Sequence, residues 1–213
     1  MHRERLFFAS CIALIATAMS FAIRIDIMAD LEGVFGLSQT QLGTVGTIAF
    51  LSFGLTILFG GPLVDLLGMG LLLRVAALCH VVGIIMTIVA PNYTILVLAT
   101  FLVGAGNGLV EAVCNPLIAT IYPEEKSHRL TLFHAWFPGG FVIGGLLTFG
   151  FTQIGLGWQL KMAMLLIPSA IYLFLIFAEK FPPTERVASN VPYMEMFLEA
   201  FRRPLFIVVF LAM

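Results

Sequence analysis

Hydrophobic residues occur in long runs, separated by short polar stretches, over almost the whole chain. A helix needs about 20 apolar residues to cross the hydrocarbon core of a bilayer, and several runs reach that length. The runs that do so lie at Leu6–Met28, Thr40–Leu63, Leu71–Ala90, Thr94–Ile121, Leu130–Ile154 and Trp158–Phe181. The pattern therefore predicts an all-α membrane protein with a bundle of six transmembrane helices over residues 1–181.

The chain continues beyond this bundle with a polar connector, residues 182–203, and a last apolar run, residues 204–213. Four apolar residues recur at helical spacing in the connector, which predicts an amphipathic helix along the membrane interface. They are Met194, Phe197, Leu198 and Phe201. The last run, "PLFIVVFLAM", has about half the length of a span. We interpret it as the start of a seventh helix in a truncated chain.

Composition agrees with a membrane protein, since 60% of the residues are hydrophobic, 11% are charged and the mean hydropathy is +1.04. The formal net charge of −1 offers no basic surface for nucleic acid. Three isolated cysteines show no metal-ligand spacing, and no nucleophile stands beside a base. We expect no metal, no cofactor and no enzymatic activity.

Positive charges are distributed unevenly among the connections, and this predicts the orientation in the membrane. Arg and Lys lie at the N-terminus and in every second connection, whereas the opposite connections hold only Lys161. Loops rich in Arg and Lys stay in the cytoplasm. We therefore expect a multi-pass protein of the cell (inner) membrane with a cytoplasmic N-terminus and an acidic outer connection, "DLEGVFGLSQTQ".

Glu111 is the clearest candidate for a functional group inside the bundle. A charge within a span costs about 2.5 to 3.5 kcal/mol and is placed there for a reason. Asn107, Glu111 and Asn115 are spaced i, i+4, i+8, so we expect them on one face that lines a cavity. Glu111 would carry a proton, and the two amides would bind solute. The alternative is a structural carboxylate tied to a neighbouring helix.

Arg24 and Asp26 place two further charges near the end of the first span. Residues two apart lie about 200° apart around a helix, so they cannot face the same partner. Thr17, Ser20 and Arg24 form a polar stripe, which favours an inward-facing Arg24 that binds solute. Anchoring at the membrane interface is the alternative for either charge.

Two histidines lie in the predicted spans. His134 opens the fifth span and could contact solute or form part of a gate, because imidazole titrates near neutral pH. His80, within the third span, is better explained as a hydrogen-bonded structural residue.

Glycine pairs predict close packing between helices. Gly104 with Gly108, and Gly140 with Gly144, have the GxxxG spacing that lets helix backbones approach each other.

The stretch "GGPLVDLLGMGLLLR" resembles the loop signature between helices 2 and 3 of the major facilitator superfamily. The matching residues are Gly61, Asp65, Gly68 and Arg74. The basic residues that usually follow are replaced by Leu66 and Met69. The resemblance implies that this loop is a gate in which Asp65 caps a neighbouring helix or pairs with a cationic side chain.

"GNGLVEAVCNP" and "YPEEKSHRLTLFHAWFPGG" are similar to helices 4 and 5 of the fucose–proton symporter branch. On this resemblance Glu111 corresponds to the carboxylate of proton coupling and Asn115 to a nearby polar position. Asp26 approximates an aspartate late in helix 1 that also takes part in coupling. His134 falls where the branch often has an amide.

These observations predict the N-terminal half of a secondary transporter, with a missing C-terminal six-helix half as its partner. It would move a small hydrophilic solute, a sugar, by proton symport and alternating access. One alternative is an organic anion or drug-like compound as solute, which Arg24 would suit. Another is a non-transporting membrane protein that binds a partner or lipid, with a structural Glu111.

Overall fold

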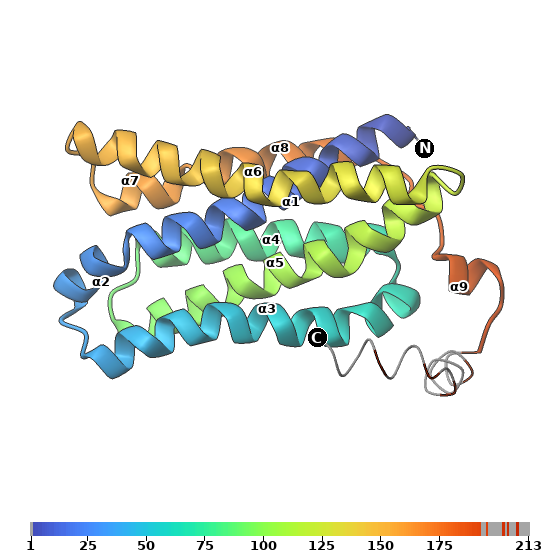
Figure 1. The fold of residues 1–213 in the computed structure, drawn as a ribbon. Coiled ribbons are helices and arrows are strands. Elements are labelled where there is room, and N and C mark those ends of the chain that lie inside the picture. The colour runs from blue at the N-terminus through green and yellow to red at the C-terminus, as the bar shows by residue number, and fades with distance from the viewer. Residues whose placement is uncertain (1, 193–194, 196–201, 203, 205–207, 209–213) are drawn as a thin grey trace.

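The computed structural model describes residues 2–192 and four isolated positions, 195, 202, 204 and 208. Every regular element within them is an α-helix (Figure 1). The helices are α1 (Arg3–Asp26), α2 (Met28–Phe35), α3 (Gln39–Leu67), α4 (Met69–Ile88), α5 (Tyr93–Ile121), α6 (Lys126–Gln153), α7 (Trp158–Ala163), α8 (Leu166–Ile176) and α9 (Glu185–Ala188). The predicted amphipathic helix and seventh span lie outside the described residues, apart from the isolated positions.

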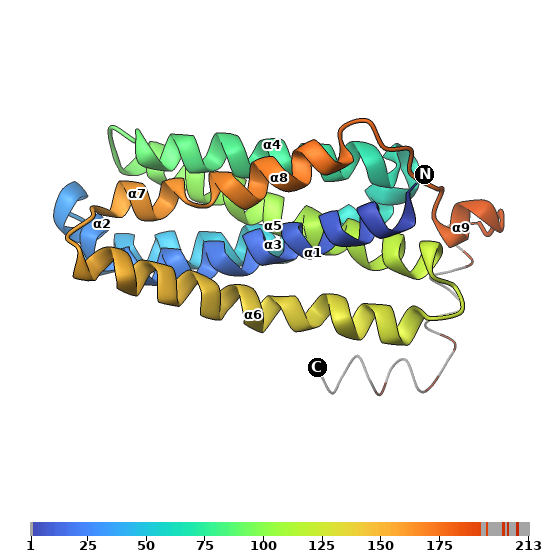
Figure 2. The same ribbon diagram turned by 90° about the horizontal axis from the view of Figure 1, so that it is seen from above.

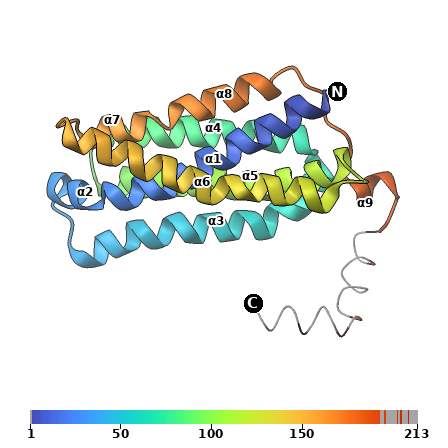
Figure 3. The ribbon, with the colours of Figure 1, turned by 45° about the horizontal axis from the view of Figure 1, so that its top comes forward.

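Six helices in the described part are long and apolar enough to cross a membrane: α1, α3, α4, α5, α6 and the α7–α8 pair. The predicted all-α membrane fold is thereby confirmed. These helices lie lengthwise, so their connections gather at two ends (Figures 1 and 2). The N-terminus and α9 mark one, which we call the N-terminal end, and α2 marks the other, which we call the α2 end (Figure 3).

The six spans form two sets of three. In one set α5 packs along both α3 and α4, and in the other α1 packs along α6 and α8. Contacts of α1 with α5, and of α4 with α8, join the sets. The first and fourth spans therefore each exchange sets, which is the arrangement of two interlocked three-helix repeats.

Glycines set the closest approaches within both sets. A Cβ atom on Gly108 would lie 2.5 Å from the carbonyl oxygen of Phe53 in α3, and Gly104 faces the same helix. Gly140 and Gly144 of α6 meet the backbone of α1 in the same way. Both predicted GxxxG contacts are confirmed, because a side chain at these positions would separate the helices.

The first span begins and ends earlier than predicted, and its connection is not a plain loop. α1 covers Arg3–Asp26 rather than Leu6–Met28, and α2 occupies the first half of the stretch expected as the acidic outer connection. Ile27 and Leu31 are fully buried. Burial of these apolar side chains holds α2 against the bundle, an effect that hydropathy along the chain does not reveal.

The last span, predicted as one helix to Phe181, is interrupted between α7 and α8 and ends at Ile176. Pro168 has no N–H to donate to the carbonyl of Met164. That carbonyl instead accepts from Ile167 at 3.1 Å, and the chain tightens by one residue there. The predicted continuous helix was wrong because a proline early in a helix can also mark a restart.

The glycine contacts lead to a stability prediction. Gly108→Ala should destabilise the bundle by about 1 to 3 kcal/mol, because the new methyl group meets backbone atoms of α3 that cannot move independently. Gly145→Ala is the matched control, since nothing lies within 4 Å of its Cβ position. Unfolding of the detergent-solubilised protein should show a lower Tm for the first variant only. Equal Tm values would contradict the packing.

Candidate functional site

A hydrogen-bonded chain of buried side chains crosses the bundle and joins the two helix sets. Tyr172 of α8 and Asn107 of α5 both contact the imidazole of His80, at 3.0 Å from Nδ1 and 2.9 Å from Nε2. Asn107 Nδ2 donates to Ser20 Oγ of α1 at 2.8 Å. Ser20 in turn donates to the carbonyl oxygen of Thr17. His80, Asn107 and Tyr172 are each at most 2% exposed.

The donors in this chain follow from the amide of Asn107. Because Asn107 Nδ2 donates to Ser20, its Oδ1 is the atom that faces His80, so Nε2 of His80 carries a hydrogen. Nδ1 then accepts from the hydroxyl of Tyr172. The imidazole is neutral in this arrangement and its ring nitrogens are both satisfied. His80 is therefore the structural residue that the sequence predicted.

The predicted polar stripe on α5 divides in two, which corrects the expectation of a single face. Asn107 turns into the core, whereas Glu111 and Asn115 are half-buried. A helix advances about 100° per residue, so eight residues accumulate about 80° of drift. In this conformation Asn107 offers no surface to a solute.

Glu111, Asn115 and His134 form a second hydrogen-bonded group, between α5 and α6. Asn115 Nδ2 donates to the Glu111 carboxylate at 2.9 Å and to its backbone carbonyl at 2.8 Å. The amide oxygen of Asn115 therefore faces His134, whose Nε2 donates to it at 2.9 Å. His134 is exposed. The structure thus brings three predicted site residues together at a partly open position.

Asp26 and Arg24 have different surroundings, as their spacing predicted. The carboxylate of Asp26 accepts from Lys161 Nζ of α7 at 2.7 Å, although Lys161 is only 5% exposed. This ion pair fastens the end of α1 to α7. The sequence identified Lys161 as an isolated charge but gave no sign of its partner, which lies 135 residues away.

Arg24 is 5% exposed, and its Nη1 has no hydrogen-bond partner among the described residues. An unpaired buried charge costs several kcal/mol. Arg24 lies in the last turn of α1, where the helix dipole contributes about 0.3 to 1 kcal/mol and at most about 2. The dipole therefore leaves most of the cost uncompensated. Anchoring at the membrane interface does not fit so buried a guanidinium.

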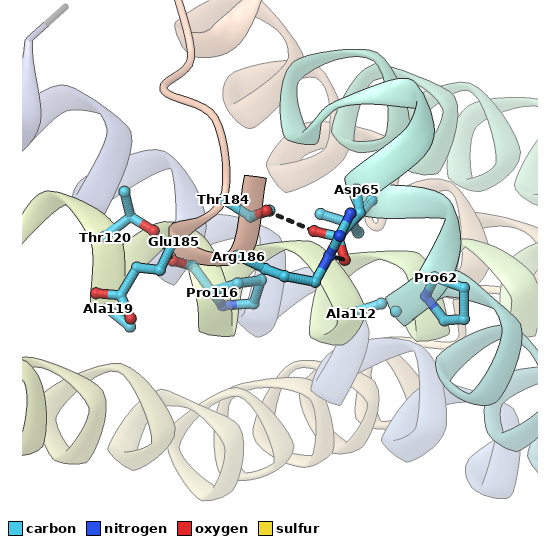
Figure 4. A pocket seen from close by; sticks show the side chains of 11 residues that line it. Pro62, Asp65, Ala112, Pro116, Ala119, Thr120, Thr184, Glu185 and Arg186 are labelled. Carbon is cyan, nitrogen blue, oxygen red and sulfur yellow. Dashed lines mark hydrogen bonds and ion pairs between the residues drawn. The ribbon is translucent and has the colours of Figure 1, made fainter. Parts of the chain in front are cut away.

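Asp65 is bound by the segment that follows the last span. Arg186 Nε donates to Asp65 Oδ2 at 2.6 Å, and the Thr184 hydroxyl donates to Oδ1 (Figure 4). Of the two contacts that the resemblance implied for Asp65, the structure shows the pairing with a cationic side chain. The sequence did not identify Arg186 as that side chain. Helix α3 ends at Leu67, and the next residue, Gly68, has a φ of +85° that suits glycine.

A pocket of about 400 Å³ lies beside this ion pair at the N-terminal end. It is bordered by α3, α5 and the α9 segment, and Figure 4 shows Asp65 and Arg186 on one side and Pro116 between them and Thr120. Gly61 lines it as well. Two of the predicted gating residues therefore border one cavity.

Arg74, the fourth residue of the predicted gating loop, lies elsewhere at the same end. Its Nη2 donates to the carbonyl oxygen of Glu179 at 3.2 Å, and its guanidinium lies over the ring of Phe181. The carboxylate of Glu179 pairs with Arg5 at 3.5 Å. The stretch after α8 is therefore held by α1 and α4 before it reaches α3.

Known proteins share both the sequence pattern and the fold of this chain. The sequence model of the Major Facilitator Superfamily matches residues 6–213. The chain belongs to this superfamily. The superfamily prediction is confirmed, while the fucose–proton symporter branch remains a prediction.

Similar sequences come from several solute transporters. A myo-inositol transporter of Candida albicans is 25% identical over 145 residues, which is 68% of this chain and 24% of that protein. A niacin transporter, NiaP, of Acinetobacter baylyi is 25% identical over 178 residues, 83% of this chain and 38% of that protein. This chain therefore spans well under half the length of these relatives.

Solved structures share the fold. The proton:xylose symporter XylE superposes with a TM-score of 0.78 at 15% identity, over 91% of this chain and 48% of that one. A bacterial homologue of the human drug peptide transporters PepT1 and PepT2 gives a TM-score of 0.70 at 18% identity, over 90% and 46%. Both likenesses are to about half of a transporter.

The chain through His80 leads to a second stability prediction. Tyr172→Phe should cost about 1 to 3 kcal/mol, because Nδ1 of His80 then remains buried without a donor. Tyr93→Phe is the matched control, since the hydroxyl of Tyr93 makes no hydrogen bond within the described residues. Denaturant unfolding should separate the two variants. Equal free energies of unfolding would show that the Tyr172–His80 bond contributes nothing.

Proposed function

We propose that this chain forms half of a secondary transporter that moves a small hydroxylated solute by proton symport and alternating access. The single observation that carries the proposal is the group formed by Glu111, Asn115 and His134. It places a carboxylate in a membrane span, half-buried and within reach of two polar side chains. Intramembrane carboxylates of this kind mark proton and solute pathways.

The solute class is supported by the relatives. Myo-inositol transporters of two yeasts, monosaccharide-sensing proteins of Arabidopsis thaliana and a xylose–proton symporter fold are among the similar proteins. The niacin transporter extends the range beyond sugars. A second six-helix half would complete the cavity.

Asn115 gives the coupling a physical basis. Its amide nitrogen faces the carboxyl group of Glu111 and its amide oxygen faces His134. A protonated Glu111 needs an acceptor for its new O–H, which a rotated Asn115 amide would supply. The amide nitrogen would then face His134 and require its Nε2 to accept. Proton loading on Glu111 would thus change the hydrogen bonds that α6 presents to the solute. Asp26, which is paired with Lys161, would take part in proton coupling at the α2 end.

The charge distribution supports a cytoplasmic N-terminal end. Seven described cations lie there or in its connections: Arg3, Arg5, Arg74, Lys126, Arg129, Lys180 and Arg186. Lys161 lies toward the α2 end. The positive-inside rule then assigns the α2 end to the outside.

Uptake into energised vesicles tests the proposal, with the protein expressed from its complete reading frame. Glu111→Gln should abolish gradient-driven uptake of a sugar and leave solute exchange intact, because the amide cannot carry a proton. Glu124→Gln, an exposed position after α5, is the control and should behave as wild type. If Glu111→Gln took up the sugar as fast as wild type, proton coupling through Glu111 would be refuted and its carboxylate would have a structural role.

The Asp65–Arg186 ion pair leads to a gating prediction. Asp65→Arg should reduce transport at least about tenfold, because two cations would then oppose each other beside the pocket. The double variant Asp65→Arg, Arg186→Asp should recover part of the rate by restoring the pair in reverse. Transport rates of wild type, both single variants and the double variant measure this coupling. Additive losses without recovery would show that the pair does not control the gate.

A further inference from the structure

We propose that Arg24 binds a carboxylate of the transported solute, so that the solute is a hydroxylated monocarboxylate such as a sugar acid. This inference rests on the proposed function, since it names the chemical class of that function's solute. The described part of the chain encloses the guanidinium of Arg24 but provides no ion-pair partner for it. Arg24 is 5% exposed, and its Nη1 is buried without a hydrogen-bond partner there.

A second polar atom on the same side of α1 is also left without a partner. Thr17 is fully buried, and its Oγ1 makes no hydrogen bond within the described residues. Seven residues separate Thr17 from Arg24, so the two lie on one face of the helix, about 10 Å apart along its axis. Ser20 lies between them on this face and is bound to Asn107. On this face of α1, the hydrogen-bonded Ser20 therefore lies between two groups without a partner among the described residues, Thr17 Oγ1 and Arg24 Nη1.

The carboxylates of Asp26, Glu32 and Glu111 are already engaged by other residues. Asp26 points to a different side of α1 and pairs with Lys161 Nζ at 2.7 Å. Glu32 of α2 accepts from Gln39 Nε2 at 2.6 Å, and Glu111 accepts from Asn115. No carboxylate in the described stretches forms an ion pair with Arg24. Its counter-ion must come from outside them.

The positions of Arg24 and Glu111 fit the two ends of a small solute. The bond between Ser20 and Asn107 marks a common level on α1 and α5, which run in opposite directions (Figure 1). Arg24 lies one turn from this level toward the α2 end, and Glu111 lies one turn toward the N-terminal end. Four residues on each helix give about 12 Å between the two Cα levels. Side chains on a helix tilt toward its N-terminus, so those of Arg24 and Glu111 both lean into this gap, which has the scale of a single sugar ring with its substituents.

A carboxylate suits Arg24 better than a hydroxyl group does. A carboxylate accepts two parallel N–H bonds from a guanidinium and neutralises its charge. A hydroxyl oxygen would accept a hydrogen bond but leave the buried charge uncompensated. A sugar acid supplies the carboxylate together with hydroxyl groups for Asn115 and His134. One proton on Glu111 with one such anion is electrically neutral, so the transport step would move no net charge.

The first test is uptake of matched solutes by the full protein in proteoliposomes. The probes are glucose with glucuronate and galactose with galacturonate, which differ only in whether carbon 6 is an alcohol or a carboxylate. Wild type should take up at least one acid with a kcat/KM at least tenfold above that of its neutral partner. Arg24→Gln should lose at least tenfold for the acid and little for the neutral sugar, and Arg24→Lys should lose less than Arg24→Gln. Arg3→Gln, an exposed arginine of the N-terminal end, should change neither.

The outcomes separate this inference from the proposed function. Uptake of the neutral sugars in preference to the acids, or equal losses for both with Arg24→Gln, overturns the carboxylate site and leaves a sugar transporter. Failure of wild type to transport any of the four probes counts against the hydroxylated-solute proposal and against the carboxylate site alike.

A second measurement distinguishes a solute from a carboxylate of the remaining protein as the partner of Arg24. Without solute, Arg24→Met should raise the Tm of the full protein, because it replaces an unpaired buried cation by an apolar side chain of similar length. Addition of the acid should raise the Tm of wild type and not that of Arg24→Met. A lower Tm for solute-free Arg24→Met would show that another part of the protein already pairs with Arg24, and would overturn the proposal.

Discussion

The hydrogen-bonded chain from Ser20 through Asn107 and His80 to Tyr172 is the contact on which the arrangement of this half-bundle depends. It has one member on each of α1, α5, α4 and α8, so it ties together the two three-helix sets. The hydrocarbon core offers no water to replace a missing partner, and each unsatisfied group there costs several kcal/mol. This cost favours one register of α1 against α5. That register determines where the other side chains of the two helices lie relative to each other.

The same register distributes the functional candidates around the satisfied centre. Asn107 uses its amide within the core, whereas Glu111 and Asn115, one and two turns further along α5, emerge toward α6 and His134. On α1, Arg24 lies beyond Ser20 and keeps a buried nitrogen without a partner. Groups that build the bundle thus alternate along two helices with groups that are partly exposed or that have no partner among the described residues.

The N-terminal end is held by a different kind of contact, in which ion pairs connect helices to the segment after α8. Glu179 engages Arg5, Asp65 engages Arg186, and Lys126 pairs with Glu185 of α9. These groups lie near the edge of the apolar region, where partly exposed ion pairs contribute little each and can exchange partners. Such pairs can separate at a lower cost than the buried chain through His80, so the two ends of the scale of rigidity lie in the centre of the bundle and at its N-terminal end.

The sequence alone determined the membrane class, the six spans and the packing role of the GxxxG glycines, because hydropathy and residue size act locally along a helix. It favoured a structural role for His80, and the family resemblance implied that Asp65 either caps a helix or pairs with a cation. Tertiary structure decided the rest. Packing placed Asn107 in the core and left Glu111 half-buried, α2 packed where a loop was expected, and Pro168 lies in the first turn of a restarted helix. The partners of Asp26, Asp65 and His80 come from segments 135, 121 and 92 residues away, and no local pattern encodes such pairings. They arise only when segments that are distant in the sequence pack together and dehydrate the groups between them.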